Sequence, residues 1–197
     1  MRVRVVSHFM NNLLFPLHRD GFLFQYSNFL AQERLVLVHF CAIVGSIALE
    51  NYFALIANGY SGWKLFWHFI FDINMITIAL LTGIALDRAI LVAFADSTVS
   101  IEKFYADSVA CMYPLVFYVL AATPYVGRFF ALVLWSVTYI NVLGFVHAQT
   151  QLPLLQVIGL TMPGFLIVIV LVSMIFAQDW HRAYLLISRS IDQGKNG

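Results

Sequence analysis

The sequence predicts an all-α integral membrane protein: a polytopic bundle of about five transmembrane helices. The chain is 61% hydrophobic and only 11% charged, whereas soluble domains average about 25% charged residues. Five apolar stretches approach the roughly 20 residues that a helix needs to cross a bilayer. Two of them, 105–122 and 127–146, are joined at Thr123-Pro124 with almost no room for a loop, which predicts a tight helical hairpin.

With 197 residues, the chain has room for one bundle and for no separate soluble domain. We expect an interfacial segment at 1–34, the five-span bundle at 35–178, and an interfacial helix and tail at 179–197. The first segment mixes aromatic residues with arginines, is broken at Pro16 and lacks a small-residue cleavage site. This pattern favours a segment lying in the membrane interface over a signal peptide or a disordered tail.

The first span, 35–57, contains two residues that are costly in a membrane, His39 and Glu50. They lie three helical turns apart and so share a face, with Ala42 and Ser46 between them. We expect this face to point into the bundle, with its small residues letting a neighbouring helix approach closely.

The second span, 65–93, opens with His68 and Asp72 at i and i+4. Asp87 continues the same stripe, and we expect Arg88 beside it to lie at the exit of the span and to extend towards the interface. The candidate intramembrane polar face therefore comprises His39, Ser46, Glu50, His68, Asp72 and Arg88.

Prolines shape the remaining spans. Pro114 lies inside the third span, where neighbouring helices can satisfy the carbonyl that it frees, so we expect a kink there. Pro124 suits the hairpin turn because it ends the preceding helix. The fifth span, 154–178, is interrupted at Pro163-Gly164, and a short amphipathic helix resting on the interface is predicted after it.

No catalytic chemistry is indicated. Phosphate-binding loops and common metal motifs are absent, and a net charge of +1 argues against a nucleic-acid binder. His68 and Asp72 could hold a metal or relay a proton, although a polar pair at a helix entrance fits their aromatic surroundings better. His39, Glu50 and His147 could together form a haem or quinone pocket, but histidines that satisfy bundle or interface contacts are the more frequent case. We therefore expect no cofactor, no metal and no catalytic residue.

A pattern surrounds the hairpin: Tyr113-Pro114 in its first helix, the TPYVG turn, Trp135, Gly144 with His147 in GFVHAQT, and Pro163 in the last span. Together with the FPLHRDGF segment, this pattern resembles the Yip (Ypt-interacting protein) membrane family over residues 14–175. The resemblance implies a five-helix bundle with a cytoplasmic N-terminus. Eukaryotic members work in vesicle trafficking alongside prenylated Rab-type GTPases. The long cytosolic N-terminal domain of those members is missing here, so Rab binding is not implied, and a short bacterial-type member fits better.

The leading functional hypothesis is a non-enzymatic scaffold or accessory subunit in membrane organisation or trafficking, in the inner membrane of a bacterium. Its expected partners are the lipid bilayer and other membrane proteins or further copies of itself. One alternative is a small transporter or channel component that uses the His/Glu/Asp face as a polar path. Another is a structural subunit of a larger redox or secretion complex.

Overall fold

The computed structural model describes residues 33–95, 100–123 and 126–194, and these residues form six helices and no strand. The predicted all-α class is therefore confirmed. The expectations for the N-terminal segment and for Pro124 concern residues outside the described ones. The helices are α3 (Glu33–Ala57), α4 (Gly62–Ala95), α5 (Ile101–Cys111), the 3₁₀ helix η2 (Tyr113–Ala122), α6 (Gly127–Thr150) and α7 (Leu154–Gly194).

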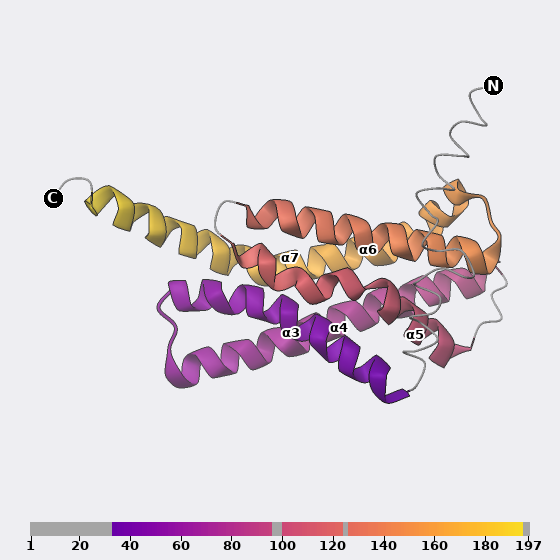
Figure 1. Cartoon of the computed structure of the whole chain (residues 1–197), viewed down its shortest axis with the longest axis horizontal. Helices are drawn as coiled ribbons and strands as arrows, with labels where there is room; N and C mark the ends of the chain where they lie inside the picture. Colours follow the sequence, from indigo (N-terminus) through magenta and orange to yellow (C-terminus); the bar gives the residue numbers. More distant parts are fainter. Residues whose placement is uncertain (1–32, 96–99, 124–125, 195–197) are drawn as a thin grey trace, which may run out of the picture.

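The helices run side by side along one axis, and the chain reverses direction at each connection (Figure 1). α3 packs against η2 and α4, while α7 packs mainly along α4. Burial of apolar surface where these helices meet forms the core, whose largest enclosed side chains include Ile43, Ile47, Leu55, Ile76, Leu80, Leu91 and Leu115.

Four helices, α3, α4, α6 and α7, are long and apolar enough to cross a membrane, and α5 with η2 makes a fifth candidate span that is bent by 41°. The bent pair starts at the end of the bundle where α4 finishes and ends at the opposite end, where α6 begins (Figure 1). Eleven α-helical and ten 3₁₀ residues extend about 36 Å along their axes. This length matches a hydrocarbon core of about 30 Å, so α5–η2 traverses the bundle as one broken span.

The break lies at Pro114, which confirms the predicted kink, but the ten residues Tyr113–Ala122 form a 3₁₀ helix that the sequence did not predict. Pro114 has no N–H to donate to the preceding turn. The next N–H, that of Leu115, bonds to Met112 at 2.9 Å instead of to Cys111. Asn141 of α6 replaces the missing backbone donor, because its side-chain Nδ2 donates to the freed Cys111 carbonyl at 3.1 Å. Such replacement partners allow a proline break inside a membrane span.

The last helix differs from expectation. Pro163 lies inside α7 without ending it, and α7 continues to Gly194. The separate C-terminal helix predicted after residue 178 is thus a continuation of the last span. Similarly, α6 extends past the predicted end of the fourth span at Val146 to Thr150. Its end is held by His147, whose Nδ1 bonds to the Leu152 carbonyl at 2.7 Å.

This topology can be tested with reporter fusions in the connections. Fusions after Gly59 and Val126 are expected on one side of the membrane, and fusions after Ser97 and Gln149 on the other, because α3 ends and α6 begins at one end of the bundle, whereas α4 ends and α7 begins at the opposite end (Figure 1). A Val126 fusion on the same side as Ser97 would instead show that α5–η2 re-enters.

Candidate functional site

Glu50 is a buried acid of the predicted polar face. It projects from α3 towards η2 and α7, and only 7% of its surface is exposed. Its carboxyl lies within electrostatic range of the Trp180 indole and of the Tyr118 hydroxyl. Its Oε2 atom is buried and has no hydrogen-bond partner among the described residues. A buried carboxyl with an unmet oxygen is unusual enough to require either a structural or a functional explanation.

Ser46, one turn before Glu50, joins α3 to the 3₁₀ helix η2. Its Oγ accepts a hydrogen bond from the backbone N–H of Val119 at 2.9 Å. Ser46 and Glu50 thus share the inward face that the sequence predicts. The prediction that the whole face points into the bundle is wrong for its first part, because Ala42 is exposed and His39 is only half-buried.

Aromatic side chains from η2, α6 and α7 form a cluster that begins at Tyr118, the neighbour of Glu50 on η2. The Trp135 indole Nε1 donates to the Tyr118 hydroxyl at 3.3 Å, and the two rings meet edge-on at 6.0 Å. Trp135 also packs edge-on against Phe165 of α7 at 5.9 Å. Sequence reasoning missed Tyr118, although a tyrosine inside a span normally seeks a polar partner for its hydroxyl when buried.

Asp72 belongs to a different contact. Asn51 donates from Nδ2 to Asp72 Oδ2 at 3.0 Å, and this pair joins α3 to α4 with exposed fractions of 0% and 4%. His68, its predicted neighbour, is exposed and packs edge-on against Tyr60 at 4.7 Å. His68 and Asp72 therefore face different surroundings, which argues against the hypothesis that they hold a metal or relay a proton together. Sequence reasoning missed Asn51, whose amide in a span was the available signal.

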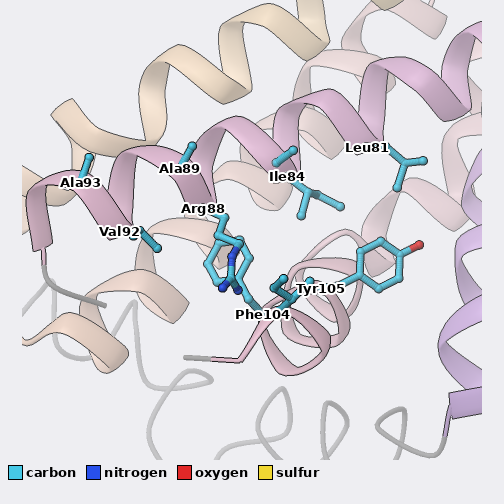
Figure 2. A pocket seen from close by; sticks show the side chains of 10 residues that line it. Leu81, Ile84, Arg88, Ala89, Val92, Ala93, Phe104 and Tyr105 are labelled. Atoms are coloured by element: carbon cyan, nitrogen blue, oxygen red, sulfur yellow. The ribbon is translucent and has the colours of Figure 1, made fainter. Parts of the chain in front are cut away.

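Asp87 and Arg88, adjacent on α4, face different neighbours. The Asp87 carboxyl lies against Gly164 of α7, where a side chain on that glycine would collide with it. Its Oδ1 is buried and finds no hydrogen-bond partner in the described part of the chain. Arg88 instead lines a cleft of about 780 Å³ between α4 and α5, together with Ile84 and Phe104 (Figure 2). α4 continues for about two further turns beyond Arg88, to Ala95.

The six residues of the predicted polar face therefore occupy separate places. Ser46 and Glu50 lie together, Asp72 pairs with Asn51, Arg88 lines the cleft, His68 is exposed and His39 is half-buried. Within the described ranges, no three His, Cys, Asp or Glu side chains are close enough to hold a metal ion. Of the predicted structural residues, Pro114 makes the break, Gly144 is buried on α6, and Tyr113 begins η2.

Two more interhelical pairs fasten α5 to α6. Cys111 and Asn141 bond to each other twice. The Cys111 thiol donates to the backbone carbonyl of Asn141 at 3.6 Å, and Asn141 Nδ2 donates to the backbone carbonyl of Cys111. Gln149 Nε2 donates to Asp107 Oδ2 at 3.3 Å near the end of α6. Each of these pairs joins two neighbouring helices. Comparison of the chain with protein-family models, with curated proteins and with solved structures finds no match.

Proposed function

We propose that this chain is a non-enzymatic multi-pass membrane protein, a scaffold or accessory subunit that organises other proteins in the membrane. One observation carries the proposal: several polar side chains inside the bundle join neighbouring helices in pairs. Ser46 joins α3 to η2, Asn51 joins α3 to α4, and Asn141 joins α6 to α5. Transport requires polar groups that follow one another across the membrane, whereas these pairs lie on different helix seams.

Such pairs favour one arrangement of the helices. Individual hydrogen bonds between membrane helices contribute about 0.6 kcal/mol on average, so several are needed to select one packing among similar apolar ones. A bundle held in this way keeps its outer surface constant, as a scaffold requires. The expected setting is the bacterial inner membrane, and the expected partners are lipids and other membrane proteins or further copies of this chain. The resemblance to the Yip family supports a role in membrane organisation.

A transporter is the second candidate, and Glu50 is the observation that favours it. A buried carboxyl with an unmet oxygen could take up a proton or cation during transport. Against this, Asp87, the other acid with an unmet buried oxygen in the described ranges, meets α7 at Gly164, whereas Glu50 meets it near Trp180. The two positions on α7 are 16 residues, or about 24 Å, apart along the helix. A proton could not pass directly between them.

Replacement of Glu50 with glutamine separates the two candidates. Glutamine keeps the shape and the hydrogen-bonding capacity of the side chain, so the scaffold proposal expects a change in the free energy of unfolding below about 1 kcal/mol. Melting in detergent measures the stability. Proton and cation flux into proteoliposomes measures the activity, and wild-type flux is expected to equal that of empty liposomes.

The matched control is Glu102→Gln, which alters an exposed acid in the first turn of α5. The scaffold proposal fails if wild-type protein conducts ions, Glu50→Gln abolishes the flux at unchanged melting temperature, and Glu102→Gln leaves the flux intact. Purification in mild detergent adds a second readout. A visible absorbing cofactor in the purified protein would favour a redox subunit instead.

A further inference from the structure

The cleft between α4 and α5 combines an apolar wall with one permanent positive charge. Its volume of about 780 Å³ lies in the range of small-molecule sites, roughly 300–1,000 Å³. Arg88 is the only charged side chain that lines it in the described structure, and it projects from α4 across the cleft towards Phe104 of α5 (Figure 2). The other lining residues are Leu81, Ile84, Ala85, Ala89, Val92, Ala93, Ile101 and Tyr105.

The depth of Arg88 follows from the opposite end of the same helix. Trp63 and Trp67 are 70% and 53% exposed, and exposed tryptophans at the start of a span occupy the membrane interface. Arg88 follows Trp67 by 21 residues, or about 32 Å of α-helix, which equals the thickness of the hydrocarbon core. The guanidinium therefore lies at the level of the opposite headgroups. Leu81 and Ile84, one to two turns earlier, lie at the level of acyl chains.

We propose that this cleft binds one anionic phospholipid, with an acyl chain along Leu81 and Ile84 and the phosphate at Arg88. An arginine suits this role because its planar guanidinium pairs with phosphate oxygens through two hydrogen bonds. Lys103, exposed in the first turn of α5, adds a second positive charge at this end of the bundle, partly offset by exposed Glu102. Asp87 does not oppose the phosphate, because its carboxyl faces α7.

Charge favours a lipid over the two other occupants. The first 32 residues of the chain contain three arginines and one aspartate, so that segment carries a net charge of +2 and would meet Arg88 with the same sign. A symmetric dimer formed through the cleft would place two copies of Arg88 in one interface. An anionic headgroup is instead attracted by Arg88, and an acyl chain matches the apolar wall.

Native mass spectrometry of the purified full-length chain tests the proposal. We expect phosphatidylglycerol to bind more tightly than phosphatidylcholine with the same acyl chains. Arg88→Gln should weaken phosphatidylglycerol binding about fivefold and leave phosphatidylcholine binding unchanged, and Arg88→Lys should retain most of it. The matched control is Lys64→Gln, which removes a positive charge from the other end of α4 and should have no effect. Equal affinity of the wild-type chain for both lipids, or equal losses in the Arg88→Gln and Lys64→Gln variants, would overturn the proposal.

A photoreactive amino acid at Ile101 identifies the occupant without relying on Arg88 variants. Ile101 lines the cleft and is 68% exposed. A benzoylphenylalanine at this position should therefore leave folding undisturbed and reach the cleft. Illumination in vesicles containing phosphatidylglycerol and phosphatidylcholine is expected to add the mass of one phosphatidylglycerol. An adduct with a peptide from residues 1–32, or a covalent dimer, would show that another part of the chain or a second copy occupies the cleft.

Discussion

Replacing Gly164 with leucine is expected to prevent stable packing of α7 against α4. A Cβ at this position would collide with the Asp87 carboxyl and would lie 3.0 Å from the Gly83 carbonyl oxygen. The aspartate can move aside in part, but the backbone of α4 cannot. Gly83 faces the same seam from the other side, where an added Cβ would collide with Val168. Overpacking at such a seam costs about 3 kcal/mol or more, because membrane helices rely on close backbone approach.

The matched control lies on the same helix. Gly159→Leu adds the same side chain five residues earlier, where no atom of the described structure lies within 4 Å of the place that a Cβ would take and the residue is exposed. We expect Gly159→Leu to fold and to melt within a few degrees of the wild type, and Gly164→Leu to lose most of its folded fraction. Size-exclusion chromatography and melting in detergent measure both variants. Equal stability of the two would show that α4 and α7 do not meet at Gly83 and Gly164.

Replacing Asn51 with leucine is expected to lower the free energy of unfolding by about 2–3 kcal/mol. The change removes the Nδ2 donor that reaches Asp72 at 3.0 Å inside the bundle. A neutral hydrogen bond between membrane helices contributes about 0.6 kcal/mol on average. The larger loss is expected because the acceptor is a carboxyl that stays buried after its amide partner has gone.

Two further variants test this explanation. Asn74→Leu is the matched control, since Asn74 is an exposed asparagine of α4 whose Nδ2 bonds within its own helix to Ile70 at 2.7 Å. It should leave the stability within about 0.5 kcal/mol of the wild type. The double variant Asn51→Leu/Asp72→Leu should recover most of the loss, because it removes the buried carboxyl together with its Asn51 donor. No recovery would show that Asp72 has a role other than pairing with Asn51.

Much of the fold could be predicted because a membrane restricts the choices. The apolar stretches predicted the spans, and the missing N–H of Pro114 predicted the break in the third one. The length of the 3₁₀ segment that follows the break could not be predicted. It depends on partners from other helices: Asn141, which bonds to the freed Cys111 carbonyl, and Ser46, which accepts from Val119. The continuation of α7 beyond residue 178 was missed for another reason, since an amphipathic pattern does not say whether the preceding helix ends.

The candidate site was predicted less well. Glu50 and Asn51 are neighbours in sequence, but successive residues of an α-helix point about 100° apart. Glu50 consequently faces η2 and α7, whereas Asn51 faces α4. Asp87 and Arg88 divide in the same way between α7 and the cleft.

The amino-acid sequence was sufficient to predict an all-α membrane bundle, the approximate positions of its spans and the span that is broken at a proline. Which polar side chains meet became apparent from the packing of the helices. Because these spans are apolar on nearly every side, no amphipathic pattern marks which face meets which neighbour. The rotation of each helix about its axis is set by close contacts such as Gly83 with Val168 and by pairs such as Asn51 with Asp72.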